Sequence, residues 1–308
     1  MALTQVTERR PEVASSKLEN LRLVNTFTGN SSALTISPDG RTLVSGRSAV
    51  KLWNLETGEL IRTLNGHSGY IKSTAFTPDG KSLVSCGLGD TIEWWDFATG
   101  ELIRRFTGDS YAGNSVAISP DGRILACGNR GKSVQMWNLK TGKAVSSLLR
   151  HEDWVTSIAF SPDSEILASG SYDKTIKLWD VNTQKEIFTL DRHLFPVYSV
   201  AISSDGNILA SGSADETIKI WNLKTGREIN TLTGHTDEVY SVAISPDGEI
   251  LASGSGDETI KLWNLVTGEE IHTLTGHSSC VKSVAFSNDG RILTSASADG
   301  HINIWRLD

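Results

Sequence analysis

The stretch Leu251-Ala-Ser-Gly-Ser-Gly-Asp-Glu-Thr-Ile-Lys-Leu-Trp263 occurs several times along the chain in nearly the same form. Residues 208–221 and 166–179 match it closely, and each copy ends on a tryptophan. Seven of the nine tryptophans follow one another at a constant interval of 42 residues: Trp53, Trp95, Trp137, Trp179, Trp221, Trp263 and Trp305. A fixed period of this length indicates a repeat architecture, so the repeats are interpreted before any single motif.

Composition limits the classes of protein that need to be considered. The 308 residues are 38% hydrophobic, with no apolar run near 18 residues, which predicts no membrane span. Residues 1–10 lack the apolar core of a signal peptide, which favours the cytoplasm. Cys86, Cys127 and Cys280 have no metal-ligand spacing, and an odd number suits reduced thiols. The net charge of -7 gives no general attraction for nucleic acid, so we expect no nucleic-acid partner.

The chain divides into a short tail and a long repeated part. Residues 1–20 carry balanced charges and Pro11 without sustained apolar alternation, which predicts a mobile tail. A partner-binding arm is the alternative for this segment. Residues 21–308 are expected to form one domain of seven repeats of about 42 residues.

The sixth repeat gives the pattern of strands within one unit. Residues 238–244 alternate as a strand, and Ser245-Pro-Asp-Gly248 forms a turn in which proline and glycine supply the required φ angles. Residues 250–255, 259–264 and 270–275 read as three further strands, with a turn at Thr267-Gly268 before the last. Four short antiparallel strands in 42 residues predict one blade of a propeller.

Gly-His, followed about 28 residues later by Trp-Asp or Trp-Asn, is a second pattern in the repeats. The residue after the tryptophan is aspartate at Asp96 and Asp180 and Arg306 in the last unit; asparagine follows at Asn54, Asn138, Asn222 and Asn264. This pattern resembles the WD-repeat (WD40) family of β-propellers over residues 21–308, and the near-identical repeats are similar to bacterial, especially cyanobacterial, members. The resemblance predicts an all-β fold, a seven-bladed propeller of four-stranded antiparallel blades.

The two ends of the repeated region predict how the ring closes. After Trp305 only three residues remain, so the seventh unit has three strands. Residues 22–30 match residues 59–67, which form the fourth strand of the first unit. We therefore expect the N-terminal strand to complete the last blade and to remove the open sheet edges.

Units four to seven each carry a histidine, a serine, an aspartate and a tryptophan at fixed spacing. A single set of this kind would suggest a nucleophile with its base and an orienting acid, but one catalytic pocket needs only one triad. In WD-repeat proteins the matching residues form a buried hydrogen-bond network from indole through hydroxyl and imidazole to carboxylate, and the first serine of each Ser-Gly-Ser pair is assigned to it from this resemblance. These structural tetrads are His151, Ser169, Asp173 and Trp179; His193, Ser211, Asp215 and Trp221; His235, Ser253, Asp257 and Trp263; His277, Ser295, Asp299 and Trp305. We expect no catalytic residue.

The first three units depart from this pattern. Unit two keeps His67, Ser85 and Trp95 but has Gly89 in place of the aspartate; unit three has Asp109, Cys127 and Gly131 at the histidine, serine and aspartate positions; unit one has Asn30 at the histidine position and no aspartate. Either these units have drifted, or they have been altered for a function. The glycines belong to repeated turns, and the histidines and cysteines show no ligand spacing, so we expect no cofactor and no metal.

Function is expected on the face that carries the loops between units, because the turns of the opposite face are nearly uniform from unit to unit. Residues just after each Gly-His and just before each tetrad aspartate vary, and in WD-repeat proteins these positions surround the channel mouth and contact peptides or partner loops. The candidate partner-binding residues of this top face are Tyr70, Lys72, Arg130, Trp154, Tyr172, Tyr198, Glu238, Tyr240 and Lys282. Tyrosine, tryptophan and arginine are enriched at binding hot spots. Four of the aromatic residues form an expected arc, and the three cations suit an acidic group, although single exposed aromatics are also common without a function.

The sequence therefore predicts a monomeric, non-enzymatic scaffold that binds a protein or peptide on its top face. It predicts cytoplasmic location, either as a free-standing chain or as a module of a longer one. The alternatives are an enzyme with a pocket at the channel mouth, and a recently amplified repeat array with a purely structural role.

Overall fold

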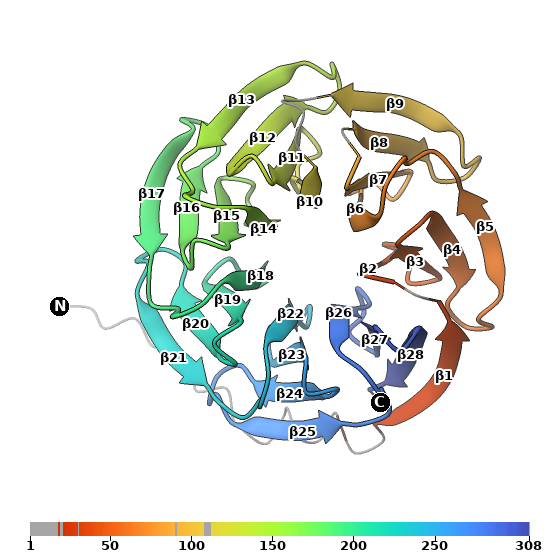
Figure 1. Ribbon diagram of the computed structural model, residues 1–308, viewed down its shortest axis with the longest axis vertical. Helices are drawn as coiled ribbons and strands as arrows, with labels where there is room; N and C mark the ends of the chain where they lie inside the picture. Colours follow the sequence, from red (N-terminus) through yellow and green to blue (C-terminus); the bar gives the residue numbers. More distant parts are fainter. Residues whose placement is uncertain (1–17, 19–20, 30, 90, 108–111, 308) are drawn as a thin grey trace.

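A computed structural model describes Leu18 and residues 21–29, 31–89, 91–107 and 112–307. All regular secondary structure in these residues is β and forms seven sheets. Figure 1 shows the sheets arranged in a ring with their inner strands around a common axis, and the region along this axis is called here the central channel. The expected mobile tail lies outside the described residues except for Leu18, so it stays a prediction. No helical segment of the described chain has the length and apolar character that a membrane span requires.

Each sheet is a blade of four antiparallel strands, numbered here from the inner to the outer strand. Blades 1 to 3 contain β2 (Ala33–Ile36), β3 (Thr42–Gly46), β4 (Val50–Asn54) and β5 (Leu60–Leu64); β6 (Ile71–Phe76), β7 (Ser82–Gly87), β8 (Thr91–Asp96) and β9 (Leu102–Thr107); β10 (Gly113–Ile118), β11 (Ile124–Asn129), β12 (Ser133–Asn138) and β13 (Ala144–Leu149). Blades 4 to 6 contain β14 (Val155–Phe160), β15 (Ile166–Ser171), β16 (Ile176–Asp180) and β17 (Lys185–Leu190); β18 (Val197–Ile202), β19 (Ile208–Ser213), β20 (Ile218–Asn222) and β21 (Glu228–Leu232); β22 (Val239–Ile244), β23 (Ile250–Ser255), β24 (Ile260–Asn264) and β25 (Glu270–Leu274).

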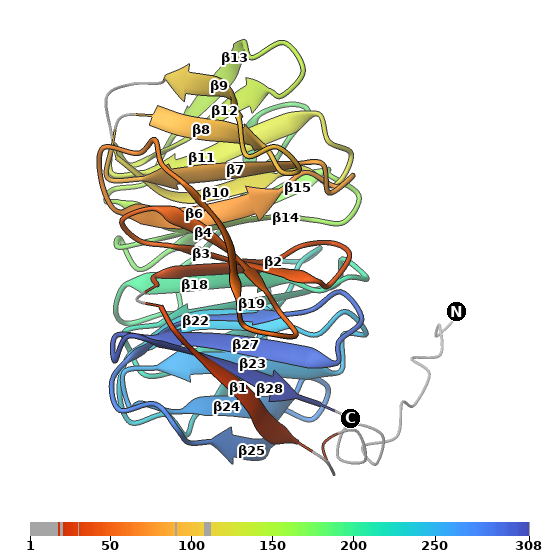
Figure 2. The same ribbon diagram turned by 90° about the vertical axis from the view of Figure 1, so that its right-hand side faces the viewer.

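Blade 7 joins the two ends of the repeated region. It contains β26 (Val281–Phe286), β27 (Ile292–Ser297), β28 (His301–Arg306) and, as its outer strand, β1 (Arg22–Thr28). In this pairing Leu23 lies opposite Trp305 and Phe27 opposite Ile302. Figure 2 shows β1 beside β28, although they lie at opposite ends of the sequence. The predicted seven-bladed propeller and its closure by an N-terminal strand are confirmed.

The turn between the first two strands of each blade is fixed by its own side chains. In blade 6 the Ser245 hydroxyl donates to Asp247 Oδ1 at 2.6 Å and accepts from the backbone N–H of Ile250 at 2.9 Å. Gly248 has a φ of 72°, which a residue with a side chain adopts only with strain. These turns lie at the face of the ring away from the loops that connect the blades.

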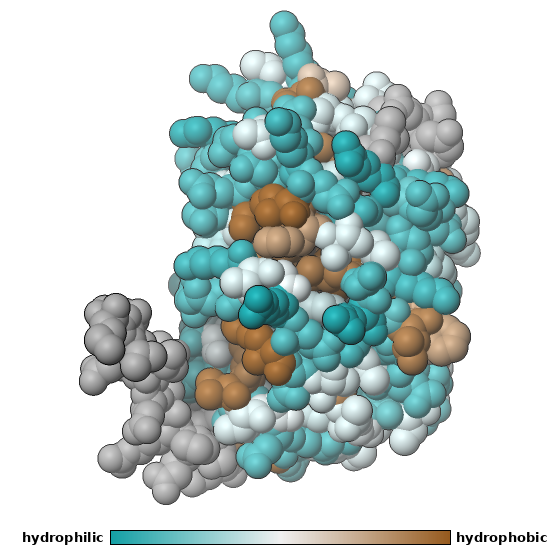
Figure 3. Space-filling model, turned by 90° about the vertical axis from the view of Figure 1, so that its left-hand side faces the viewer, coloured by the Kyte–Doolittle hydropathy of each residue, from teal (hydrophilic) through white to brown (hydrophobic). Residues whose placement is uncertain are grey.

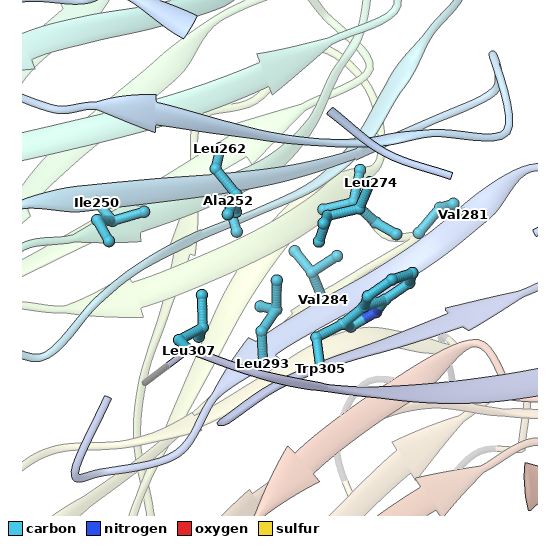
Figure 4. Close-up of a cluster of buried hydrophobic side chains, with 10 residues drawn as sticks. Ile250, Ala252, Leu262, Leu274, Val281, Val284, Leu293, Trp305 and Leu307 are labelled. Carbon is cyan, nitrogen blue, oxygen red and sulfur yellow. The ribbon is translucent and has the colours of Figure 1, made fainter. Parts of the chain in front are cut away.

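The apolar core lies between adjacent blades. Figure 4 shows one such interface, where Leu262 and Leu274 of blade 6 face Val284, Leu293 and Trp305 of blade 7. All five side chains are at most 5% exposed. Each blade buries one face against each neighbouring blade. The hydrophobic effect of this burial holds the ring together and fixes the positions of the inner strands.

Candidate functional site

The tetrads of blades 4 to 7 form continuous hydrogen-bond chains. In blade 6 the Trp263 indole Nε1–H donates to Ser253 Oγ at 2.8 Å, and Ser253 Oγ lies 2.7 Å from His235 Nε2. The His235 Nδ1 atom lies 2.7 Å from Asp257 Oδ2, so this nitrogen carries the proton and the Nε2 atom accepts from the serine. The corresponding distances in blades 4, 5 and 7 are between 2.7 and 2.9 Å.

The two serines of each Ser-Gly-Ser pair have different partners. Ser253 joins the tetrad, whereas the Ser255 hydroxyl donates to the Asp237 carbonyl at 3.0 Å and accepts from the Asp257 N–H. Both serines are completely buried. A hydroxyl that is buried and already bonded to both an indole and an imidazole cannot meet a substrate, so the tetrads tie each third-strand tryptophan to the loops of its blade.

The tetrad carboxylates are held in the ionised form. Burial alone would raise the pKa of Asp173, but the hydrogen bonds from His151 and Thr175 outweigh it, and the net pKa is well below its ordinary value. The same balance lowers the pKa of Asp299 to about 2. Burial lowers the pKa of His235, although Asp257 opposes this shift. Burial also lowers the pKa of His277, so His235 and His277 are neutral near neutral pH and each donates to its tetrad carboxylate.

Blade 2 replaces the missing tetrad aspartate with a different arrangement. The His67 Nε2 atom lies 2.7 Å from Ser85 Oγ, but the Nδ1 atom has no hydrogen-bond partner among the described residues. Glu93, whose side chain is fully buried, lies 3.4 Å from His67 Nε2 and accepts from Arg105 Nε at 3.1 Å. Sequence reasoning missed Glu93, although it breaks the pattern that places lysine at this position in blades 4 to 6 (Lys177, Lys219 and Lys261).

Blades 1 and 3 keep less of the tetrad. In blade 1 the Trp53 indole still donates to Ser45 Oγ at 2.8 Å. In blade 3 the buried Cys127 takes the place of the serine. Asn30 and Asp109, which stand at the histidine positions of these two blades, lie outside the described residues.

The top-face candidates gather at the mouth of the central channel. A cavity of about 580 Å³ opens there, and eight of the nine candidate residues line it: Lys72, Arg130, Trp154, Tyr172, Tyr198, Glu238, Tyr240 and Lys282. The ninth, Tyr70, is 54% exposed and lies under Arg47, whose guanidinium carbon is 5.7 Å from the ring centre. The residues predicted from different blades thus converge on one hollow.

Four aromatic rings line the cavity wall as an unbroken series, called here the aromatic arc. The centre of the Trp154 ring is 5.6 Å from that of Tyr172, which is 5.7 Å from Tyr198, and both pairs meet edge to face. Tyr198 and Tyr240 stack at 5.2 Å with their planes 24° apart. Such offset and edge-to-face contacts are favourable for aromatic quadrupoles and hold each ring by its neighbours.

Charged groups hold both the ends and the middle of the aromatic arc. The Arg130 guanidinium lies 4.4 Å from the Trp154 ring centre, and Lys282 Nζ lies 3.1 Å from that of Tyr240. The Tyr198 and Tyr240 hydroxyls donate to the two oxygens of Glu238 at 3.2 and 2.5 Å. Burial and then the Glu238 carboxylate raise the pKa of Tyr198 well above its ordinary value, so its hydroxyl stays a donor.

Apolar side chains are also exposed on the outer wall of the ring. In Figure 3 they form small brown patches within a largely hydrophilic surface, on the side where β13, β17 and β21 are the outer strands. Ile187 and Ile229 of these strands are 41% and 54% exposed. Within the described residues, no group of three histidine, cysteine or acidic side chains is arranged to hold a metal ion.

Comparison with protein families assigns the chain. A family model of the first β-propeller domain of WDR3 matches residues 86–265, more than half of the chain. The chain belongs to the WD-repeat β-propeller family. The WD domain, G-beta repeat, matches residues 21–54, 58–96 and 268–306, so the two models together cover nearly all of the repeated region.

Similar curated proteins share only short segments with this chain. An uncharacterized WD repeat-containing protein of Synechocystis, sll1491, is 36% identical over 72 residues, which are 21% of each chain. The small ribosomal subunit protein RACK1y of Oryza sativa is 40% identical over 72 residues, 22% of this chain and 21% of the relative. The Lissencephaly-1 homolog of Caenorhabditis briggsae is 49% identical over 37 residues, 12% of this chain and 10% of the relative. The matches thus span about a fifth or less of the length of these relatives.

Proposed function

We propose that the chain is a non-enzymatic scaffold that binds a protein or peptide partner at the mouth of the central channel, and that it does so in the cytoplasm. WD-repeat propellers are typically protein-interaction scaffolds, and the aromatic arc is the observation that supports this particular site. Trp154 and Tyr172 are each 37% exposed, so part of each ring faces solvent. Aromatic anchors in a pocket commonly carry most of the binding energy of an interface.

The aromatic arc is also organised before any partner arrives. Neighbouring rings, two cations and the Glu238 carboxylate hold the side chains in place, as their contacts above describe. Side chains that are already ordered lose little conformational entropy when a partner binds, and this lowers the cost of association. An aromatic surface that is both exposed and rigid is better suited to binding than to a purely structural role.

Binding of a purified partner tests the proposal. Proteins retained on the immobilised chain from a lysate supply the candidate partner, and its dissociation constant is then measured by isothermal titration calorimetry. The Trp154→Ala/Tyr240→Ala variant is expected to bind it at least about tenfold more weakly, since each hot-spot residue contributes about 2 kcal/mol or more.

The matched control changes two exposed apolar residues away from the channel, Ile61→Ala and Val266→Ala, which are 54% and 66% exposed. This variant should bind the partner as the unaltered chain does. A partner that binds the aromatic double variant with undiminished affinity would rule out the channel mouth as the binding site.

A further inference from the structure

A ring of hydrogen bonds around the channel joins each inner strand to the next, and it is interrupted at one place. At six of the seven blade interfaces a backbone N–H donates to a serine hydroxyl of the preceding blade at 3.1–3.2 Å: Val116 to Ser73, Ile158 to Ser115, Val200 to Ser157, Val242 to Ser199, Val284 to Ser241 and Leu34 to Ser283. Between blades 1 and 2 the serine position holds Ala33, and the facing residue is Thr74. Ala33 supplies no hydroxyl, so the pattern is broken beside the cavity.

Thr74 is itself an exception within the repeat. The other blades carry only apolar residues at this position: Leu34, Val116, Ile158, Val200, Val242 and Val284. Thr74 lines the cavity, and its hydroxyl is buried without a hydrogen-bond partner among the described residues. A buried hydroxyl without a partner is unfavourable, and an acceptor atom brought by a ligand would relieve it.

Arg130 is a second exception, and it lines the same cavity. Blades 2 and 4 to 7 have leucine, tyrosine, alanine or glycine at this position. The Arg130 Nε–H is buried and also lacks a partner among the described residues, although the guanidinium lies over Trp154. Thr74 and Arg130 therefore each have a buried donor without an acceptor among the described residues, and both residues line the same cavity.

The same side of the cavity is positively charged. Burial lowers the pKa of Lys72, and the neighbouring charges of Arg130 and Arg47 lower it further. Burial likewise lowers the pKa of Lys282, although Cys280, Glu238 and Asp237 oppose this shift, and the charge of Lys72 adds to it. Among the described residues, one acidic side chain lines the cavity, that of Glu238, and it already accepts hydrogen bonds from two tyrosines. A group of cations and unpaired donors, beside a carboxylate that is already hydrogen-bonded, is suited to an anion.

We propose that Lys72, Thr74 and Arg130 form an oxyanion site in the channel mouth, which takes a carboxylate or phosphate group carried by the partner. Oxygen atoms of the anion accept from the Thr74 hydroxyl, the Arg130 guanidinium and the Lys72 ammonium, and charge-assisted hydrogen bonds of this kind are the strong ones. The inference rests on the proposed function, because it names the group that the partner inserts beside the aromatic arc.

Titration of the full chain with inorganic phosphate, and separately with acetate, at constant ionic strength tests this site. We expect saturable binding of one anion, observed by isothermal titration calorimetry. Lys72→Met and Arg130→Ala should each weaken binding about tenfold or more, the loss of roughly one charge-assisted hydrogen bond. Thr74→Val, which restores the residue of the other blades, should weaken binding several-fold without lowering the melting temperature.

Lys224→Met is the matched control, because it removes one positive charge from an exposed turn on the opposite face. This variant should bind phosphate as the unaltered chain does. Saturable binding of phosphate alone would indicate a phosphorylated partner, and comparable binding of acetate would indicate a carboxylate.

The oxyanion site is overturned if neither anion binds saturably, or if binding is equal in all four variants. The two proposals fail in different ways. If the purified partner depends on Trp154 and Tyr240 while phosphate and acetate do not bind, the channel mouth remains the binding site and the oxyanion site is rejected. If an anion binds as expected but the partner ignores the aromatic double variant, the partner proposal is rejected.

Discussion

Replacement of Asp257 by alanine removes the acceptor at the end of one tetrad. The Asp257 carboxylate accepts four hydrogen bonds: from His235 Nδ1 at 2.7 Å, from the Thr236 N–H at 3.2 Å, and from the Thr259 N–H and hydroxyl at 3.0 and 2.6 Å. Thr236 is exposed and Thr259 is half-buried, so water can replace most of the hydrogen bonds that these two residues lose. His235 is only 6% exposed, and its Nδ1–H would be left without a partner.

The expected cost is that of one unsatisfied buried donor, about 1–3 kcal/mol of the free energy of unfolding. In a domain of 150–250 residues, each kcal/mol lowers the melting temperature by about 2–4 °C, and slightly less is expected for a longer chain. Urea unfolding at pH 7, followed by circular dichroism, measures the free energy directly, and an unchanged slope of that free energy with urea concentration would show that the same surface is exposed.

Gly89→Ala is the matched control, since Gly89 occupies the same place in blade 2 and supplies no carboxylate. A methyl group there would come within 2.8 Å only of the Ser68 hydroxyl, which can rotate away. The control should therefore leave stability nearly unchanged. Equal losses of stability in Asp257→Ala, Gly89→Ala and a surface variant such as Lys224→Ala would refute the structural role of the tetrads.

Three further predictions concern the frame of the propeller. Stability should fall as the pH drops below about 6.5, because the lowered pKa values of His235 and His277 mean that the unfolded chain takes up protons first. A second loss should begin near pH 3.8 and continue toward about 2, since the carboxyl group of Asp299 is protonated more readily in the unfolded chain, and urea midpoints between pH 8 and about pH 2 measure both losses. Deletion of residues 1–29 removes β1 and opens the ring, so cooperative thermal unfolding should be lost; a truncated chain that melts like the full one would contradict closure. Arg105→Thr introduces the residue that blades 4 to 6 carry at this position, and it should lower the free energy of unfolding by about 3 kcal/mol because the buried Glu93 carboxylate loses its ion-pair partner. Adding Glu93→Gln to this variant should recover part of the lost stability. No recovery would show that Arg105 stabilises the chain through something other than its charge.

The fold could be predicted from the sequence because the same pattern of strands, turns and tryptophans occurs in every repeat. The constant interval between tryptophans predicts the blades, and the match of residues 22–30 to residues 59–67 predicts the closing strand. Comparison of the repeats also separates structural residues from candidate binding residues. An aspartate equivalent to Asp257 occurs in four blades, whereas no other blade has a tryptophan at the position of Trp154.

The contacts between blades were harder to predict, because they depend on how neighbouring sheets are oriented. The break at Ala33 matters only because Thr74 of the next blade faces it, and one repeat considered alone does not contain that pair. Glu93 and Arg105 lie opposite one another across β8 and β9, so their pairing follows from the register of these strands. Tyr70 and Trp154 occupy equivalent positions, yet Trp154 contacts Tyr172 while Tyr70 lies under Arg47, outside the cavity lining.

The most direct test of the division between frame and binding site is one binding measurement on two variants with opposite expected behaviour. At a temperature below the melting transitions of both variants, Asp257→Ala should bind the purified partner with the affinity of the unaltered chain, although it melts at a lower temperature. Trp154→Ala/Tyr240→Ala should melt like the unaltered chain and bind at least about tenfold more weakly. If Asp257→Ala loses affinity while the aromatic variant keeps it, the assignment of tetrads to structure and of the channel mouth to binding is contradicted.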